Sequence, residues 1–301
     1  MMVYILILHY GKLEDTLECI NSVMKSSFQD FKIVIINNDE DNEIYKTLLQ
    51  LENTNPYKIK IINIAKNIGY AAGNNEGIKL AISEKARYIW ILNNDTIVDK
   101  DALKYLLFSI EQSKEYGIAS STIYYYNNPN KIWVAGGSRK YSFLDIITSK
   151  FGYYSDRDYS PSDAEGEKLL VSAVGTSMLI KTDLIKDIGL IPDEYFLYRE
   201  DTDFCLNAVK KGWKIIYSER SKVYHKYKDN EPSPTIIYYL VRNTLILIKK
   251  HYNYITLILS NIFVPIVYFS SVLFIYKNKK NLYKNIKAVI IGYLDFLIAR
   301  R

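Results

Sequence analysis

The sequence predicts an α/β protein whose mostly parallel β-sheet is covered by helices on both faces. Short, continuous apolar runs alternate with segments of helical periodicity through the first half of the 301-residue chain. Strands buried on both faces have this continuous apolar character, and strand–helix alternation is typical of a parallel sheet. Polar clusters follow several apolar runs, and in such sheets ligands bind beyond the carboxyl ends of the strands.

Four strands and three helices are expected in the first 92 residues. The strands are the apolar runs at residues 3–8, 31–36, 59–64 and 88–92. The helices fall between them, at residues 15–25, 42–51 and 70–85. Leu17, Ile20 and Val23 show the spacing of one apolar helix face.

The next segments are less regular. Helices are expected at residues 102–112, 182–188 and 201–211, and strands at 118–126, 170–174, 177–180 and 214–217. Residues 145–166 are rich in Tyr, Ser and Asp and are expected to form a loop. Gly175 indicates a close backbone approach between two strands, and Gly212 suits the position just after a helix.

The last part of the chain differs in charge and hydropathy. Residues 237–301 carry ten Lys or Arg and one acid, a net charge of +9 within a total of +6. Residues 254–276 contain no charged side chain, and that length suits a bilayer span. Basic charges that flank apolar runs favour an anionic membrane surface over nucleic acid as the partner.

Three interpretations of this tail remain open. The favoured one is a peripheral or re-entrant helical hairpin on the membrane, and the others are a true span and a buried helix in an oligomer interface, such as that of a homodimer. Pro232 and Pro234 interrupt any regular element, so the expected division is a catalytic domain at residues 1–232 and a membrane-associating region at 233–301. Two cysteines make no disulfide framework or metal spacing, which fits a reducing cytosol.

Four polar clusters follow the first four predicted strands, at residues 9–11, 37–39, 67–69 and 93–95. Their shared position predicts a binding rim along one edge of the sheet. A second acidic group, Glu200, Asp201 and Asp203, lies within four positions. One acidic site can hold a divalent cation, and the other can accept a proton from an attacking hydroxyl.

Several strings carry a family resemblance: ILHYGKLEDTLECINSV (7–23), IVIINNDEDN (33–42), NIGYAAGNNEGI (67–78), ILNNDTIV (91–98), VGTSMLIKTDLIKDIGLI (174–191), DEYFLYREDTDFCLNAVKKGWKI (193–215), VYH (223–225) and YYLVRN (238–243). With these strings the chain resembles the family-two glycosyltransferases of the glycosyltransferase-A (GT-A) fold, over about residues 3–245. It is most similar to the bacterial branch that includes rhamnosyltransferases. The resemblance implies a GT-A catalytic domain and a nucleotide-sugar donor.

The resemblance also implies roles for the donor-binding residues. His9 and Tyr10 are expected to present backbone groups to the nucleobase, and Asn37 and Asp39 to contact base and ribose. The loop that cradles the nucleotide would include Asn67, Gly69 and Asn74, where glycine lets the backbone approach the ligand closely.

The implied catalytic roles fall on the acidic clusters. Asp95, preceded by Asn93 and Asn94, matches the metal-binding residue of a D-x-D-like motif that holds Mg²⁺ or Mn²⁺ beside the diphosphate. His225 matches a position that completes the metal or diphosphate shell. Asp201 is the expected general base, and Glu200 and Asp203 are expected to brace it or to orient the acceptor.

Three positions depart from the family pattern. The family usually has Asp where this chain has Asn37 and Asn93, and Asn where it has Gly11. These departures bear on nucleotide identity and metal affinity. The expected base, Asp201, and the expected metal ligand, Asp95, both match the pattern.

The resulting hypothesis is an inverting, metal-dependent transfer of rhamnose from a dTDP or UDP donor. The acceptor would be a glycan or lipid-linked saccharide of cell-surface polysaccharide synthesis, at the cytoplasmic face of the cell membrane. A galactosyl- or glucosyltransferase of the same fold and a non-catalytic nucleotide- or glycan-binding assembly partner are the alternatives. A nucleotidyltransferase is disfavoured because Gly11–Lys12 is a poor match to a glycine-rich phosphate loop, and a two-carboxylate glycosidase would not use a nucleotide rim.

Structural explanations compete for several of these residues. Acids in the first turn of a helix favour its dipole whatever their chemistry, Asp95 suits a turn, and His225 suits a buried structural position. Trp90 and Trp213 are expected in the core, whereas Trp133 is a candidate contact of donor or acceptor. Arg242 is equally suited to a phosphate or to an acid of the chain.

Overall fold

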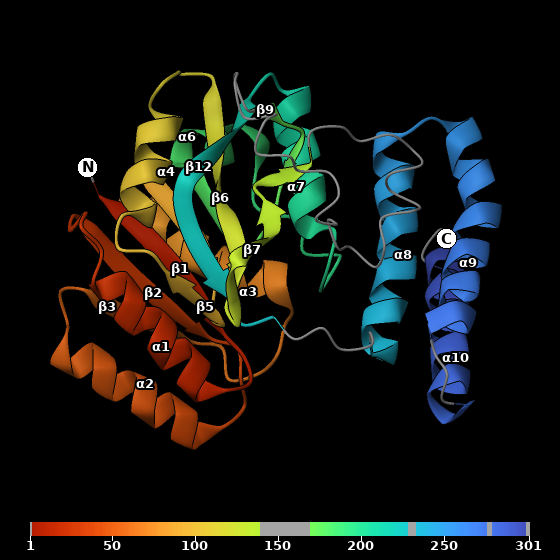
Figure 1. Ribbon diagram of the computed structural model, residues 1–301, viewed down its shortest axis with the longest axis horizontal. Helices are drawn as coiled ribbons and strands as arrows, with labels where there is room; N and C mark the ends of the chain where they lie inside the picture. Colours follow the sequence, from red (N-terminus) through yellow and green to blue (C-terminus); the bar gives the residue numbers. More distant parts are fainter. Residues whose placement is uncertain (1, 139–168, 228–232, 276–278, 299–301) are drawn as a thin grey trace.

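The computed structural model describes residues 2–138, 169–227, 233–275 and 279–298. Figure 1 shows an α/β body built on one large sheet, with three C-terminal helices beside it. The ten-stranded sheet has the order β3-β2-β1-β4-β11-β6-β12-β5, with β7 paired to β6 and β9 to β12. The loop expected at residues 145–166 lies outside the described residues.

The first half of the chain follows the predicted alternation. Its parallel strands are β1 (Val3–His9), β2 (Phe31–Asn37), β3 (Ile59–Asn63) and β4 (Tyr88–Asn93). Its helices are α1 (Leu13–Met24), α2 (Asn42–Thr54) and α3 (Tyr70–Ser83). Each expected element is present, and most bounds agree within two or three residues.

The two faces of the sheet are covered because the strand side chains alternate. Val3, Ile5 and Ile7 of β1 join a core with α1, α2 and α4 (Ala102–Ile110). Tyr4, Leu6 and Leu8 of the same strand join a second core on the other face. That second core is closed by α3, α6 (Thr182–Ile188) and α7 (Glu200–Lys210).

The second half of the sheet is mixed. Its strands are β5 (Thr96–Val98), β6 (Tyr116–Tyr125), β7 (Asn128–Ala135), β9 (Leu169–Leu170), β11 (Ser177–Lys181) and β12 (Lys214–His225), while β8 (Gly137–Ser138) and β10 (Ser172–Ala173) form a separate pair. Because β11 is antiparallel to both β4 and β6, and β12 is parallel to β6, the carboxyl ends of β4, β6 and β12 lie at one edge.

Two features of this half were not predicted. Strands β5 and β7 were missed, and β12 continues to His225 instead of ending at residue 217. Residues 218–221 are Ser-Glu-Arg-Ser, and a register shift lies between Ser218 and Lys222. The strand could not be recognised from the sequence because this irregularity interrupts the alternation of apolar and polar residues. The extension carries His225 to the sheet edge where β4 also ends.

The tail consists of α8 (Pro234–His251), α9 (Tyr254–Ile275) and α10 (Lys279–Ile298). Ser233 begins α8 by accepting a hydrogen bond from the backbone of Ile236, a typical N-cap. The three helices share an apolar core of their own. Among the described residues one helical stretch, Tyr254–Phe274, is long and apolar enough to cross a membrane, and 28% of its most apolar window is buried.

Candidate active site

A cavity of about 320 Å³ opens at the carboxyl edge of β4 and β12. It is lined by the segment after β4, the start of α7, the end of β12 and one residue of α8. The lining residues are Tyr70, Asn93, Asp95, Trp133, Val174, Gly175, Thr176, Leu197, Tyr198, Arg199, Glu200, Asp201, Thr202, His225, Tyr227 and Leu240. Folding therefore brings the two predicted carboxylates, Asp95 and Asp201, to the same cavity.

Asp95 and His225 form one polar pair in this cavity. Nε2 of His225 lies 3.1 Å from Oδ1 of Asp95, and strand β12 pairs with β5 so that His225 faces Thr96. Burial alone would raise the pKa of Asp95, but the hydrogen bond and electrostatic attraction of His225, with Lys226 nearby, hold that pKa below its ordinary value. Asp95 is therefore an anion at neutral pH, as a cation ligand must be.

Glu200 and Asp201 form the first turn of α7, where acids interact favourably with the helix dipole. Oδ2 of Asp201 accepts a hydrogen bond from the backbone N–H of Gly175 (3.0 Å), and Oδ1 accepts two from Thr202 (2.6 and 3.2 Å). Oε2 of Glu200 is buried and has no hydrogen-bond partner in the described part of the chain. These acids can interact with the helix dipole and also face the cavity, so the structural and catalytic interpretations are compatible.

The carboxyl groups of Glu200 and Asp201 affect each other's loss of a proton. Burial and the charge of Asp201 raise the pKa of Glu200 to about 8. Burial also raises the pKa of Asp201, although its hydrogen bonds oppose the shift. Hydrogen bonds to a carboxylate favour its charged form, so Asp201 ionises first and Glu200 holds the proton at neutral pH. The two neighbouring acids therefore differ in how readily they lose a proton.

Gly175 and Tyr70 were not singled out as site residues, yet both shape the cavity around Asp201. The Tyr70 hydroxyl donates to the carbonyl of Gly175 at 2.7 Å, and a Cβ on Gly175 would lie 2.8 Å from that hydroxyl. The close neighbour of Gly175 is therefore the Tyr70 side chain of α3, and not the backbone of another strand. Burial, together with Glu200, Asp201 and Asp95, raises the pKa of Tyr70 well above its ordinary value, so its hydroxyl stays a donor.

Aromatic side chains cover one wall of the cavity. The Trp133 ring stacks on Tyr227 with 5.3 Å between centroids, and it lies 4.6 Å from the His225 ring. Trp133 was a candidate contact, whereas Tyr227 was missed because it follows the unrecognised end of β12. Trp90 and Trp213 lie elsewhere, the first buried in the core with Nε1 donating to Ser177.

The predicted donor-binding residues lie along the same sheet edge, outside the cavity lining. Nδ1 of His9 lies 2.7 Å from the Thr16 hydroxyl, which accepts from Nδ2 of Asn94 at 3.0 Å. Nδ2 of Asn37 donates to Asn63, the backbone of Gly11 donates to Asp39, and Nδ2 of Asn38 donates to Asn67. These bonds join the ends of β1 to β4 into one polar edge.

Three of these residues make further hydrogen bonds within the protein. The carbonyl of His9 accepts from the backbone of Asn38, and that of Tyr10 accepts from Asn94, so both already have donors within the protein. Asn74 is fully buried inside α3 and donates to the carbonyl of Tyr70. Each carbonyl keeps a second lone pair, and Oδ1 of Asn74 is buried without a partner among the described residues.

Gly69 makes a close approach, but to the protein itself. Its φ is +93°, and a Cβ there would lie 2.6 Å from the carbonyl oxygen of Phe196. The neighbouring N–H of Tyr70 donates to that same oxygen at 2.7 Å. This contact joins the start of α3 to the segment before α7.

Asp203 and Arg242 take structural positions. Asp203 is fully buried and lies 2.6 Å from both Lys250 and His251 of α8. Burial would raise the pKa of Asp203, but the hydrogen bonds of His251 and Lys250 outweigh it and lower that pKa. Arg242 donates to the carbonyl of Glu194 and to Asn243. Both side chains therefore attach the tail to the body.

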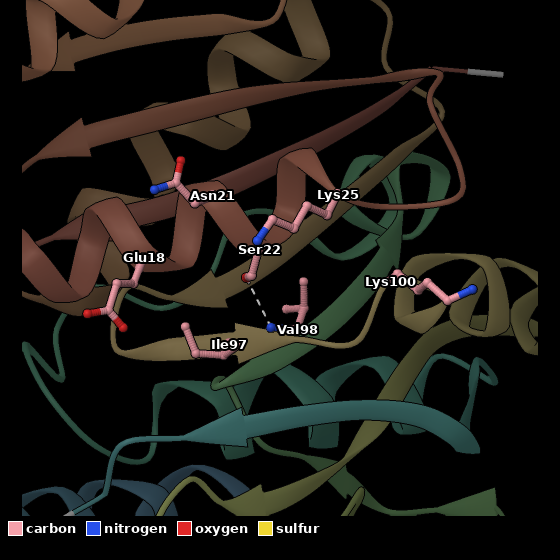
Figure 2. A pocket seen from close by; sticks show the side chains of 7 residues that line it. All are labelled: Glu18, Asn21, Ser22, Lys25, Ile97, Val98 and Lys100. Atoms are coloured by element: carbon pink, nitrogen blue, oxygen red, sulfur yellow. Dashed lines mark hydrogen bonds between the residues drawn. The ribbon is translucent and has the colours of Figure 1, made fainter.

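A second hollow, of about 390 Å³, lies between α1 and β5 (Figure 2). It is lined by Glu18, Asn21, Ser22, Lys25, Ile97, Val98 and Lys100. The dashed line in Figure 2 is the hydrogen bond from the Val98 backbone to the Ser22 hydroxyl, which attaches β5 to α1. Glu18 is already paired with Lys226 at 2.8 Å.

The donor set at the cavity fits a cation that is shared with a ligand. Among the described residues, no three His, Cys, Asp or Glu side chains are grouped to hold a metal by themselves. Asp95 offers a carboxylate, and Oδ1 of Asn93 and Nδ1 of His225 are buried without partners in the same described residues. Mg²⁺ and Mn²⁺ commonly bind one or two protein oxygens and complete their shell with phosphate and water.

Comparison with known proteins places this geometry in a family. The family model described as Glycosyl transferase family 2 matches residues 4–189. The dTDP-rhamnosyl transferase RfbF of Shigella flexneri is 20% identical over 303 residues, covering 96% of this chain and 95% of that protein. Rhamnosyltransferase WbbL of Escherichia coli K12 is 26% identical over 223 residues, covering 72% and 80%.

This chain matches only part of the length of some other relatives. The low-salt glycan biosynthesis hexosyltransferase Agl10 of Haloferax volcanii is 27% identical over 162 residues, covering 52% of this chain. The chain spans 48% of that relative, about half its length.

Solved structures agree in fold. TarS residues 1–349 of S. aureus has a TM-score of 0.56 at 16% identity, covering 99% of this chain and 83% of that one. The mannosyltransferase PcManGT from Pyrobaculum calidifontis, in complex with GDP-Man and Mn²⁺, has a TM-score of 0.55 at 10% identity and covers 99% and 88%. The predicted family and fold are confirmed: the chain belongs to glycosyl transferase family 2 and has the GT-A fold with a helical tail.

Proposed function

We propose that this protein transfers a hexose, with inversion, from a nucleotide diphosphate donor to a hydroxyl of a glycan or lipid-linked saccharide. The observation that carries the proposal is the single cavity lined by Asp95 at one side and Asp201 at the other. One carboxylate is kept anionic and the other is poised near a neutral acid, so the two are suited to different tasks. Family membership supports the same reaction class.

Asp201 is the general base in this proposal. As the acceptor oxygen attacks the anomeric carbon, its proton passes to the Asp201 carboxylate, and the bond from that carbon to the diphosphate breaks. The nucleotide diphosphate leaves with the bonding electron pair. Gly175 and Thr202 hold Asp201 in place through hydrogen bonds, and Glu200 stays neutral so that it does not repel the charge on its neighbour.

Asp95, with Asn93 and His225, would hold Mg²⁺ or Mn²⁺ beside the donor diphosphate. A bound cation supplies positive charge where the diphosphate becomes more negative. The buried, unpartnered Oδ1 of Asn93 beside the Asp95 carboxylate supports this assignment, and the contact from Nε2 of His225 to Asp95 would orient that carboxylate. The polar edge from His9 to Asn67 lies where a nucleoside would extend from the diphosphate, along the ends of β1, β2 and β3.

Rhamnose, carried by dTDP, is the donor we favour. RfbF and WbbL, which both carry rhamnosyltransferase names, are relatives that cover most of this chain. The departure at Asn37 falls on the edge where the nucleobase would lie, so UDP is the alternative nucleotide. Galactose and glucose are the alternative sugars.

The tail would place the enzyme at the cytoplasmic face of a membrane. Along α9, exposed apolar residues recur every three or four positions: Ile255, Ile258, Ile262, Ile266, Phe269 and Leu273. The opposite side of α9 is buried against its neighbours through Leu257, Val264, Tyr268 and Val272. A helix packed along one side and apolar along the other suits a position in the membrane surface, beside a lipid-linked acceptor.

A panel of nucleotide sugars tests the proposal. The thermal midpoint of the purified chain is measured with dTDP-rhamnose, UDP-galactose and UDP-glucose, each with Mn²⁺ and with EDTA. A donor at 100 times its dissociation constant stabilises a protein by about 2.7 kcal/mol, so one donor should raise the midpoint only when Mn²⁺ is present. A chain that no nucleotide sugar stabilises, or one that binds a donor but never forms product, would contradict the proposed activity.

A further inference from the structure

The segment before α7 has an unusual backbone. Phe196, Tyr198 and Arg199 have φ values of +61°, +68° and +78°, in the left-handed region that side-chain-bearing residues rarely adopt. They account for three of the five such non-glycine residues in the described chain. The segment leads directly into Glu200 and Asp201. Its conformation needs support from outside, because the residues themselves disfavour it.

Asn243 of α8 supplies that support from the tail. Its Nδ2 donates to the carbonyls of Tyr195 (2.9 Å), Leu197 (2.7 Å) and Tyr198 (2.9 Å). The side chain is fully buried, and its Oδ1 accepts from Arg242 at 2.8 Å, which fixes the orientation of the amide. On the other side of the segment, the N–H of Tyr70 donates to the carbonyl of Phe196.

The attachment of α8 to the body does not depend on Asn243 alone. Lys250 and His251 pair with the buried Asp203, and Arg242 donates to the carbonyl of Glu194. Leu240 and Val241 add buried apolar contacts. Asn243 differs from these residues because its amide is directed at the carbonyls of the left-handed segment.

We propose that Asn243 is a positioning residue, which holds residues 195–199 so that the first turn of α7 presents Asp201 to the cavity. The proposal rests on the function proposed above, in which Asp201 is the base. The tail then contributes to turnover as well as to location, since α8 carries both the amide that fixes the base and the apolar face against which α9 packs.

The test replaces the amide of Asn243 with an apolar side chain of similar size. Asn243→Leu removes all three donated hydrogen bonds, and Thr244→Val is the matched control. Thr244 is the next residue of α8, is equally buried, and lies 3.4 Å from the Tyr268 hydroxyl of the tail instead of the segment. We expect kcat to fall on the order of 100-fold in Asn243→Leu, because a small misplacement of a catalytic group has that effect. Donor affinity should stay within threefold, and the control should match the wild type.

The pH profile separates positioning from general weakening of the fold. A released segment admits water to Asp201, which lowers its raised pKa, so the acidic limb of kcat should move to lower pH in Asn243→Leu. Thr244→Val should not move that limb. Should Asn243→Leu fail to fold, Arg242→Met, which removes the partner of the amide oxygen, should show the same shift with a fall in kcat of about tenfold.

Hydrogen exchange tests the contact independently of any activity. The backbone amides of residues 195–203 should exchange at least about tenfold faster in Asn243→Leu than in the wild type and in Thr244→Val. If the wild type has no transferase activity, the proposed function is wrong, but the exchange rates still test whether Asn243 holds the segment. Unchanged exchange, or an active wild type whose Asn243→Leu variant keeps kcat within threefold, would overturn the positioning role.

Discussion

Nε2 of His225 lies 3.1 Å from Oδ1 of Asp95, although 130 positions separate the two residues. The contact exists because β12 runs in the same direction as β4 and ends at the same edge of the sheet. It fixes one side of the cavity, and Asp201 on α7 fixes the other. The predictions below follow from this division of roles.

Asp201→Asn should abolish transfer while donor binding survives. The amide keeps the shape of the side chain but cannot accept the acceptor proton, and loss of a general base costs on the order of 10²–10⁴-fold in rate. Product formation and donor-dependent thermal shifts are measured side by side. Asp183→Asn, at an exposed carboxylate of α6, serves as the control. Near-wild-type turnover in Asp201→Asn would remove Asp201 from the mechanism.

Asp95→Asn should remove the metal dependence of donor binding. The substitution removes the anionic oxygen that the cation would use and leaves His225 without a carboxylate partner. We expect the donor-induced thermal shift in Mn²⁺ to fall to its value in EDTA, and turnover to fall about 10²-fold or more. If the Mn²⁺-dependent shift persists at full size in this variant, the cation binds elsewhere.

The stability of the protein should fall as pH rises toward 8, and Glu200 should be one cause. The pKa of this buried carboxyl is about 8 in the fold, against about 4.3 in an unfolded chain. The folded state therefore binds the extra proton between these values, and the stability gained from neutral Glu200 is present below pH of about 4.3 and lost progressively toward pH 8.

Glu200→Gln tests this because glutamine stays neutral at every pH. Thermal midpoints are measured at pH 5, 7 and 9. The variant should lose less stability than the wild type over this range, by at least about 3 °C at pH 9. Glu43→Gln, at an exposed carboxylate of α2, should follow the wild type. Parallel curves for wild type and Glu200→Gln would show that Glu200 does not hold the proton.

The exposed face of α9 should bind anionic vesicles. Ile262→Glu combined with Ile266→Glu places two charges on this exposed face. Each isoleucine that the membrane buries would contribute roughly 1.5–3 kcal/mol to the binding free energy. Flotation with phosphatidylglycerol vesicles should fall at least about tenfold, whereas Phe108→Glu, at an exposed aromatic of α4, should leave it unchanged. Unaltered flotation together with a dimer that dissociates in the double variant would assign the face to a second copy.

The alternating first half of the fold was predictable because each buried strand is a continuous apolar run and each helix has its own periodicity. The site was partly predictable for the same reason: Asp95 follows a recognisable strand, and Asp201 lies in a distinctive acidic string. Strands β5 and β7 and the end of β12 were missed because short or bulged strands lack a regular pattern. Tyr227 was missed as a consequence.

Other assignments depended on contacts that no local pattern records. The sequence indicated a close approach at Gly69 but not that the carbonyl of Phe196 lies there. Asp203 belongs to the same acidic string as Asp201, yet it pairs with Lys250 and His251 because successive positions on a helix point in different directions. Burial of a carboxylate and the identity of its partner are properties of the packed chain.

The sequence by itself determined the alternating elements of the first half, the family and the two acidic groups, because apolar periodicity and short motifs are local. Only the tertiary structure decided that Asp95, Asp201 and His225 share one cavity, and that Asn243 of the tail supports the segment before α7. Strand direction brings Asp95 and His225 together across 130 positions, and helix packing brings Asn243 to Tyr195 across 48. Those contacts form only when the sheet and the tail are assembled, so no stretch of sequence contains them.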